Sequence, residues 1–268
     1  MPITGDGHGT NAPPRVLLVN DDGLSAEGLA LLEEQVREFT DDVWVVAPQY
    51  ENSGGGHSVS LDKPVRVRQL AEKRFAVSGT PTDCVLMAYW ELMADAPPSI
   101  VLSGINPGEN LGEDMTYSGT MGAAMEAAVL GLPAVALSQK RTLGRTPDFT
   151  AAKTAGPALL RSLLSFDWSA GLVVNVNFPI NLVDSGRPRM TRLGQRHIGT
   201  FKPMVGIDGR NIPYYWIKVS YDPGNPAPDT DLAAVTAGYV AVTALSMDLT
   251  SPELNARLAA EFAKETEN

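Results

Sequence analysis

The sequence predicts an α/β fold: a Rossmann-like, mostly parallel sheet with helices on both faces, followed by a smaller C-terminal region with an antiparallel hairpin and a helix. Three observations support this prediction. Short apolar runs alternate with segments of helical spacing through the first two thirds of the chain, which is typical of a parallel sheet covered by helices. Near Pro179 the alternation stops and hairpin-like strands follow. A chain of 268 residues is long enough for one large domain with an appendage.

The first strand is predicted at residues 16–19, because an apolar run bounded by turn residues is typical of a strand that is buried on both faces. It is followed closely by two adjacent carboxylates and a glycine, Asp21, Asp22 and Gly23. Residues 25–40 then carry apolar side chains at helical spacing, which predicts a helix. The two aspartates are therefore expected at the carboxyl end of a central strand, where open α/β sheets bind their ligands.

The elements that follow repeat this order of strand and helix. A helix is predicted from Thr80 to about Met93, because Thr80 can cap it, Pro81 suits the first helical position and Asp83 completes a capping-box pattern. The other elements predicted in this part are strands at residues 43–47, 99–103, 134–138 and 172–176 and helices at residues 119–130 and 148–166.

The C-terminal part has a different pattern. Segments 189–193 and 206–220 are predicted as antiparallel strands or a long hairpin, and Asp208 and Gly209 supply a turn signal within it. The remaining predicted elements are a short helix at residues 231–238, a strand at residues 239–245 and an amphipathic helix at residues 252–264.

We therefore expect three parts: a disordered N-terminal extension at residues 1–14, an α/β core at residues 15–180, and a C-terminal hairpin and helix region at residues 181–268, with a late strand and helix that pack on the core. The predicted hairpin carries three consecutive aromatic residues, Tyr214, Tyr215 and Trp216. They form either a contact surface or simply an edge strand with large side chains.

Charge and composition exclude several classes of function. The chain has 21 basic and 31 acidic residues and a net charge of −10, which argues against binding of a nucleic-acid polymer, since counterion release needs clustered Lys and Arg. A small anion is still a suitable ligand, because a bound cation and backbone N–H groups can hold it locally. The one cysteine, Cys84, excludes an intramolecular disulfide and a cysteine-based zinc site. No apolar run is long enough to cross a bilayer and residues 1–14 lack an apolar segment, so we expect no membrane association and a cytoplasmic location.

The pair Asp21 and Asp22 is a candidate metal site. Two adjacent negative charges repel each other unless a cation is shared between them, and neither aspartate has a basic partner nearby in the sequence. The alternative is a solvated Asp-Asp-Gly turn, which is common. Of the two interpretations we favour the metal site.

Three further loops have a corresponding position, each after a predicted strand or before a predicted helix. In the first, residues 52–58, three consecutive glycines can turn successive N–H groups toward one anion. Gly54 and Gly55 are therefore candidates for substrate binding, Ser53 can offer an oxygen to a metal, and His57 can approach a phosphate. The alternative for this loop is a flexible linker.

The other two loops offer amide and hydroxyl groups. Asn106 follows a predicted buried strand and carries a hard, neutral oxygen ligand, although an ordinary turn residue is the equal alternative. Ser118, Gly119 and Thr120 open the predicted helix at residues 119–130. Hydroxyl and N–H groups at a helix N-terminus form an anion site, and the alternative there is a plain helix cap.

Together the four loops place carboxylate, amide and hydroxyl oxygens at one predicted edge of the sheet. Such a set suits a hard cation, Mg²⁺ or Mn²⁺, better than Zn²⁺ or copper. A hard cation beside anion-binding N–H groups is the arrangement that phosphoryl chemistry requires. The chain has no Gly-x-Gly-x-x-Gly after the first strand, no Gly-x-x-x-x-Gly-Lys-Ser/Thr loop and no Gly-x-Ser-x-Gly turn. Their absence argues against a dinucleotide oxidoreductase, an NTPase and a serine hydrolase.

Several motifs of the chain occur together in one known family: VLLVNDDG, VVAPQYENSGGGHS, SGTPTDCV, IVLSGINPGENLGEDMTYSGT, VNVNFP and TDLAAVTAGYVAVTAL. From about Arg15 to the C-terminal helix, the chain resembles the SurE family in the order and spacing of these motifs. Members of this family are divalent-metal-dependent nucleotidases.

The resemblance implies an activity and a set of site residues. The implied activity is hydrolysis of nucleoside 5′- or 3′-monophosphates to nucleoside and phosphate, that of a phosphoric monoester hydrolase of the 5′-nucleotidase type, with some action on short polyphosphate. The implied ligands of one divalent ion per subunit, Mg²⁺ or Mn²⁺, are Asp21, Asp22, Ser53 and Asn106, and the two aspartates are also the implied catalytic residues. The implied phosphate-contacting residues are Asn110, Ser118, Gly119 and Thr120, next to the glycine loop.

The resemblance also implies a homodimer or homotetramer that assembles through the C-terminal region. Residues 214–216 and the terminal helix would then lie at an interface between subunits. One departure from the family is Asn52, which stands where a basic residue is frequent. Its neutral side chain implies a weaker electrostatic contact to the substrate.

Two alternative functions make different predictions. Phosphatases that form an aspartyl-phosphate intermediate share only the aspartate after the first strand, and their Asp-x-Asp spacing is absent because Asp22 and Gly23 follow Asp21 directly. The second alternative is a non-catalytic, metal-dependent nucleotide-binding regulatory protein. It would bind a nucleotide without releasing phosphate.

Overall fold

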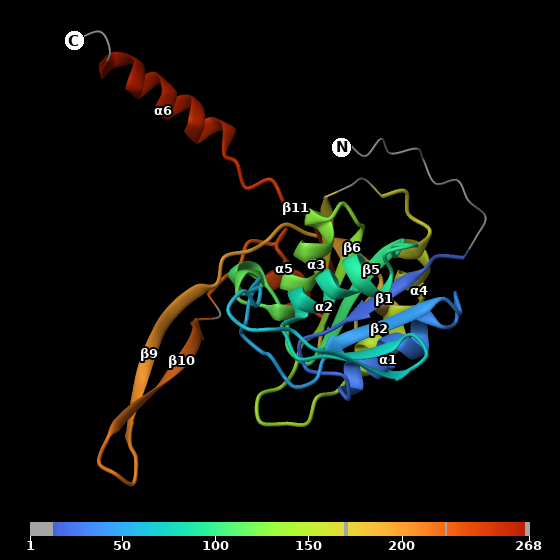
Figure 1. The fold of residues 1–268 in the computed structure, drawn as a ribbon. Helices are drawn as coiled ribbons and strands as arrows, with labels where there is room; N and C mark the ends of the chain where they lie inside the picture. Colours follow the sequence, from blue (N-terminus) through green and yellow to red (C-terminus); the bar gives the residue numbers. More distant parts are fainter. Residues whose placement is uncertain (1–12, 169–170, 223, 266–268) are drawn as a thin grey trace.

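A computed structural model describes residues 13–168, 171–222 and 224–265 of the chain. Most of the predicted N-terminal extension, residues 1–12, lies outside the described part. Figure 1 shows a layered α/β body from which the hairpin and the last helix project. Among the described residues, no helix combines the length and the apolarity that a membrane span needs.

The body is built on a nine-stranded sheet in the order β3-β4-β2-β1-β5-β6-β7-β11-β8. The run from β4 to β7 is parallel, whereas β3 and β11 pair antiparallel with β4 and β7. The predicted fold class, a mostly parallel sheet with a small antiparallel hairpin, is therefore confirmed. The strands are β1 Val16–Val19, β2 Val43–Pro48, β3 Val67–Ala71, β4 Arg74–Val77, β5 Ile100–Asn106, β6 Ala134–Gln139, β7 Leu172–Phe178, β8 Pro188–Met190 and β11 Val240–Ser246.

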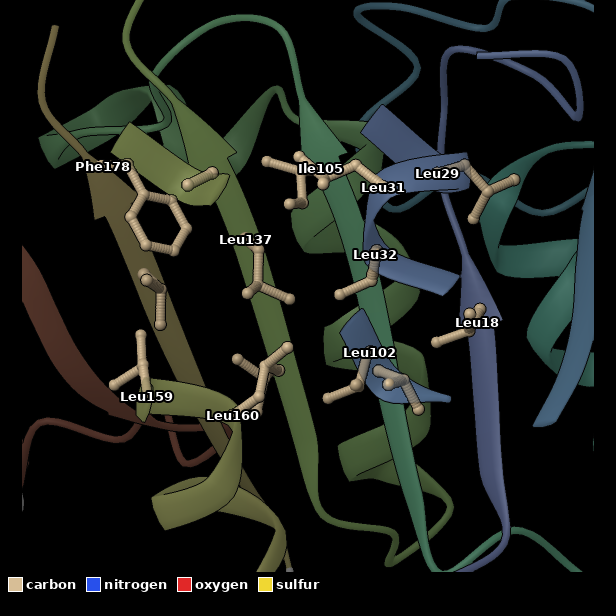
Figure 2. Close-up of a cluster of buried hydrophobic side chains, with 14 of the residues drawn as sticks. Leu18, Leu29, Leu31, Leu32, Leu102, Ile105, Leu137, Leu159, Leu160 and Phe178 are labelled. Carbon is tan, nitrogen blue, oxygen red and sulfur yellow. The ribbon is translucent and has the colours of Figure 1, made fainter. Parts of the chain in front are cut away.

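The main helices cover both faces of this sheet. Helices α1, Glu27–Val36, and α4, Thr150–Leu164, pack on one face, while α2, Pro81–Met87, and α3, Gly119–Val129, pack on the other. Consecutive residues of β1 point to opposite faces, which gives each layer its own apolar core. Figure 2 shows the first of these cores, where leucines of β1, β5 and β6 lie beneath leucines of α1 and α4.

Local signals explain where several helices begin. The predicted capping box of α2 is present, because the Thr80 hydroxyl accepts the N–H of Asp83 and the Asp83 carboxylate accepts the N–H of Thr80. The helix continues as a π-helical turn at Ala88–Leu92. Helix α1 is shorter than the predicted 25–40, and its N-cap, Ala26, has no side chain that can cap it.

Two strand predictions need correction. Segment 189–193 was expected to be antiparallel, but β8 pairs in parallel with β11. Strand β3 was not predicted, because it is largely exposed and carries polar residues, so that its apolar pattern is weak. Strand β4 was also not predicted, although three of its four residues are buried.

The region after residue 180 consists of three parts, which differ in how they contact the main sheet. Strand β11 extends the main sheet, and α5, Asp231–Thr236, packs against it. Strands β9, His197–Ile207, and β10, Pro213–Asp222, form the predicted antiparallel hairpin, which is longer than expected and projects from the body. Helix α6, Pro252–Glu265, points away from the body, and its side chains from Pro252 to Ala263 are exposed.

Candidate active site

The loops after β1, β2, β5 and β6 open into one pocket of about 850 Å³. These four strands are neighbours in the sheet, so their carboxyl ends meet at one edge. The lining residues are Asp21, Asp22, Glu51, Ser53, Gly54, Asn106, Pro107, Gly108, Glu109, Asn110, Asp114, Tyr117, Ser118, Arg141 and Ile217. The structure thus brings seven of the ten predicted site residues to one cavity, while Gly55, Gly119 and Thr120 are not among the lining residues.

Asp21 lies almost fully buried at the start of α3. Its Oδ1 accepts the hydroxyl of Thr120 at 2.6 Å, and its carboxylate also accepts the backbone N–H of Thr120. Burial raises the pKa of Asp21 above its ordinary value, although the bonds from Thr120 oppose this rise. Because a helix N-terminus favours a negative charge, the anion at the start of α3 is the carboxylate of Asp21 itself.

Asp22 is the least satisfied carboxylate of the pocket. Its Oδ2 is buried and has no hydrogen-bond partner among the described residues. Burial first, then the charge of Asp21 and then that of Glu51 raise the pKa of Asp22 to about 7. The charge of Arg141 opposes this rise without cancelling it, so the donor set fits a cation placed between the two adjacent carboxylates.

Ser53 and Asn106 supply neutral oxygens to the same cavity. The Ser53 hydroxyl donates to the Glu51 carboxylate at 2.9 Å, so its lone pairs stay available. The Asn106 Nδ2 donates to the Gly108 carbonyl at 2.7 Å, which leaves its Oδ1 as an acceptor. Within the described part of the chain, no group of three or more His, Cys, Asp and Glu side chains could hold a metal. A metal in this pocket would therefore need these neutral oxygens beside the two aspartates.

The glycine loop is held against α3. The N–H of Gly56 donates to the Tyr117 carbonyl at 3.1 Å, and the His57 Nε2 lies 2.7 Å from the Glu126 Oε2. A Cβ atom at Gly122 would overlap the carbonyl oxygen of Gly56, so only glycine allows this close approach. His57 is thus paired with α3 and does not line the pocket.

The residues at the start of α3, which were predicted to contact phosphate, also make contacts within the protein. Thr120 is fully buried and its hydroxyl is committed to Asp21. A Cβ atom at Gly119 would lie 2.8 Å from the Cβ of Asp21, so this glycine allows the aspartate to pack on the helix. Ser118 caps the helix by accepting the N–H of Met121, and it also lines the pocket. Thr120 and Gly119 therefore position Asp21 and do not face the cavity.

Asn110 is held by hydrogen bonds to buried polar residues that were not predicted as part of the site. Its N–H donates to Asn177 at 2.8 Å, its Nδ2 donates to Ser138 at 2.8 Å, and its carbonyl accepts from Asn175 and Asn177. The signal was present in the sequence, because Asn175 and Asn177 are polar residues in an otherwise apolar, buried strand.

Other lining residues were also not predicted: Glu51, Glu109, Asp114, Tyr117, Arg141 and Ile217. Of these, Ile217 belongs to β10, so the hairpin contributes to the cavity. Glu109 and Asp114 are paired with the buried Arg196 at 3.4 and 3.1 Å. Glu51, Glu109, Asp114 and Tyr117 lie within the motifs quoted above, close to predicted site residues. Arg141 and Ile217 lie outside those motifs, and the tertiary fold brings them to the cavity.

Comparisons with known proteins agree with this architecture. The family described as "Survival protein SurE" matches residues 16–200. A protein of Rhizorhabdus wittichii named 5′-nucleotidase SurE is 47% identical over 253 residues, which cover 93% of this chain and 98% of the relative. A protein of the same name from Methylorubrum populi is 45% identical, with coverage of 92% and 99%. The solved structure of a SurE protein from Aquifex aeolicus is similar with a TM-score of 0.76 and 35% identity, over 90% of this chain and 96% of that one. The chain therefore belongs to the SurE family.

Proposed function

We propose that this protein is a divalent-metal-dependent phosphomonoesterase that hydrolyses nucleoside 5′- or 3′-monophosphates to nucleoside and phosphate, with some action on short polyphosphate. The observation that carries the proposal is the pair Asp21 and Asp22, a buried and a half-buried carboxylate with raised pKa values, in a cavity that also holds the oxygens of Ser53 and Asn106. The relatives named 5′-nucleotidase SurE support the substrate class.

The proposed metal ligands are Asp21, Asp22, Ser53 and Asn106, which would hold one Mg²⁺ or Mn²⁺ ion per subunit. Each offers an oxygen to the pocket, and hard oxygen donors suit these ions. When bound, such an ion supplies Lewis acidity toward a phosphoryl oxygen and lowers the pKa of water.

The two aspartates have different surroundings and therefore different proposed roles. Asp21 is fixed by Thr120, so its orientation is set before a ligand arrives. Asp22 has an oxygen without a hydrogen-bond partner in the described residues. We assign Asp22 to orienting the attacking water and accepting its proton, because the carboxylate of Asp21 is already committed.

The neutral groups of the pocket are the proposed phosphate contacts. Ser118 accepts a hydrogen bond from Met121, so its own hydroxyl proton is available to a phosphate oxygen. Asn110 gives one Nδ2 hydrogen to Ser138, which leaves the second for a ligand. Gly54 lines the pocket with a positive φ of 76°. A Cβ built there would meet no atom within 4 Å, so the space beside this glycine is open to a ligand. Such donors stabilise the charge that develops on phosphoryl oxygens.

We also propose that the protein forms a homodimer or homotetramer through its C-terminal region. Three consecutive aromatic side chains of β10, Tyr214, Tyr215 and Trp216, are exposed. Helix α6 exposes Leu254, Leu258 and Phe262 at intervals of one turn. Exposed apolar surface of this kind marks an interaction site. A cytoplasmic location is part of the same proposal.

A phosphate-release assay with a panel of nucleoside monophosphates tests the proposed function. We expect release with Mg²⁺ or Mn²⁺, none with a chelator, and loss of most activity in Asp21→Asn with the fold retained. Near-normal turnover of that variant at saturating metal would contradict the role of Asp21. Binding of nucleotide without release across several metals would instead indicate a regulatory protein, and a trapped phosphorylated aspartate would indicate the aspartyl-phosphate mechanism.

A further inference from the structure

The pocket is strongly acidic for a site that would take a phosphate. Five carboxylates line it: Asp21, Asp22, Glu51, Glu109 and Asp114. Arg196 pairs with Glu109 and Asp114, and a divalent ion offsets two further charges, but a phosphomonoester adds about two negative charges at neutral pH. Binding of the substrate therefore calls for a further source of positive charge on the pocket wall.

Arg141 is the one lining residue with a cationic side chain in the described part of the chain. It follows β6, whose neighbour β5 leads into the Asn106 loop. A Cβ atom built at Gly108 would lie 3.9 Å from the Arg141 Nε, so the guanidinium lies beside that loop. Its charge also reaches Asp22, whose pKa it lowers against the larger effects that raise it.

Arg141 is not engaged elsewhere. The nearby Arg196 forms ion pairs with Glu109 and Asp114 and is almost fully buried. In contrast, the exposed side chain of Arg141 forms no ion pair and no hydrogen bond with the described residues at ordinary contact distances. An anion can therefore bind to it without the loss of an existing ion pair.

From this placement we propose that Arg141 binds the phosphoryl group of the substrate directly, in the pocket that Asp21 and Asp22 also line. This inference rests on the proposed phosphomonoesterase function and adds a specificity residue to it. A guanidinium presents two parallel N–H donors that match two phosphate oxygens, which a neutral amide or hydroxyl cannot do. It also favours phosphorylated ligands over neutral nucleosides, because only the charged phosphoryl group is attracted by the positive guanidinium.

Lys140 offers a matched control. It is the sequence neighbour of Arg141 and carries the same charge, but it borders a separate cavity of about 270 Å³ with Ile180 and residues of α5. Removal of the positive charge at position 140 changes the net charge of the protein as much as removal at position 141. Only the second change removes a donor from the candidate active site.

The test compares the full chain with Arg141→Gln, Arg141→Lys and Lys140→Gln, with Mn²⁺ present and adenosine 5′-monophosphate as the substrate. We expect Arg141→Gln to lower kcat/KM about ten- to one-hundredfold and to raise the inhibition constant of inorganic phosphate by a similar factor, as for loss of a hydrogen bond to a charged group. Arg141→Lys should recover part of both losses, because it keeps the charge without the paired donors. Lys140→Gln should match the parent.

An unchanged inhibition constant in Arg141→Gln, or equal effects of Arg141→Gln and Lys140→Gln, would overturn the inference. Calorimetric titration of the Mn²⁺-loaded protein with inorganic phosphate separates this failure from that of the proposed function. If the parent releases no phosphate from any monophosphate, the proposed function fails. The inference on phosphate binding still stands if the parent binds phosphate and Arg141→Gln does not, and it fails if neither binds.

Discussion

Replacement of Asp22 by asparagine should make the metal-free protein more stable at neutral and alkaline pH, although it removes a proposed catalytic group. The pKa of Asp22 is about 7 in the folded protein, against an ordinary value of 3.8. The folded state thus binds the proton of Asp22 more tightly than the unfolded state. Stability is highest below the unfolded pKa and is lost as the pH rises through the folded pKa.

The size of this effect follows from the two pKa values. One pKa unit corresponds to about 1.36 kcal/mol, so a rise from 3.8 to about 7 corresponds to at most about 4 kcal/mol. Solvent at the pocket screens part of it, and we expect about 2–4 kcal/mol. The asparagine variant does not carry this cost, because its side chain stays neutral. Its advantage over the parent should therefore grow between about pH 4 and pH 8.

Urea unfolding of the parent and Asp22→Asn at several pH values, with a chelator present, measures this difference directly. Added Mg²⁺ or Mn²⁺ should reverse the order, because an ion that binds only the folded state stabilises the parent more than the variant. Asp62→Asn serves as the control, since Asp62 is exposed and does not line the pocket. Parallel pH profiles of the parent and Asp22→Asn without metal would refute the reasoning.

Three further predictions concern the support of the site. Thr120→Val removes the 2.6 Å hydrogen bond to Asp21 and should weaken Mn²⁺ binding about tenfold or more in a calorimetric titration. Thr120→Ser keeps the hydroxyl and should bind Mn²⁺ as the parent does. Equal Mn²⁺ affinities of the two variants would contradict the positioning role of Thr120. Glu126→Gln weakens the 2.7 Å contact with His57 that holds the glycine loop on α3, so it should raise KM for nucleoside monophosphates by a few-fold. An unchanged KM would show that this contact does not order the loop. Chelation should abolish phosphate release and lower the urea midpoint at pH 8, both reversibly, and a midpoint that is insensitive to metal would argue against a bound ion.

Much of the fold was predictable because its signals are local. Each of the apolar runs of β1, β2 and β6, and likewise the capping box of α2, is contained within a few consecutive residues. Parallel strands also bring their carboxyl ends to one edge, so the common location of the loops after β1, β2 and β5 followed from the order of elements. The errors fall on short, exposed strands: β3 was not predicted and the pairing of β8 was predicted wrongly, because few of their side chains are buried.

The contacts that support the site could not be predicted from the sequence, because they join distant segments, even where a polar residue in an apolar strand was itself a signal. Thr120 reaches Asp21 across 99 positions, and Asn175 reaches Asn110 across 65. A threonine at a helix start has the same local pattern whether it binds a ligand or a neighbouring carboxylate. The same holds for Arg141, which no motif marks and which only the tertiary fold brings to the cavity.

The most direct test of the account is a crystal of the full chain grown with Mn²⁺, measured at the manganese absorption edge. We expect one anomalous peak per subunit in the pocket, with an oxygen of Asp21, Asp22, Ser53 and Asn106 each about 2.1 Å from the ion or bridged to it by one water. An anomalous map with no peak at these residues, or with the ion bound at another site while the nucleotidase activity is intact, would contradict the central claim.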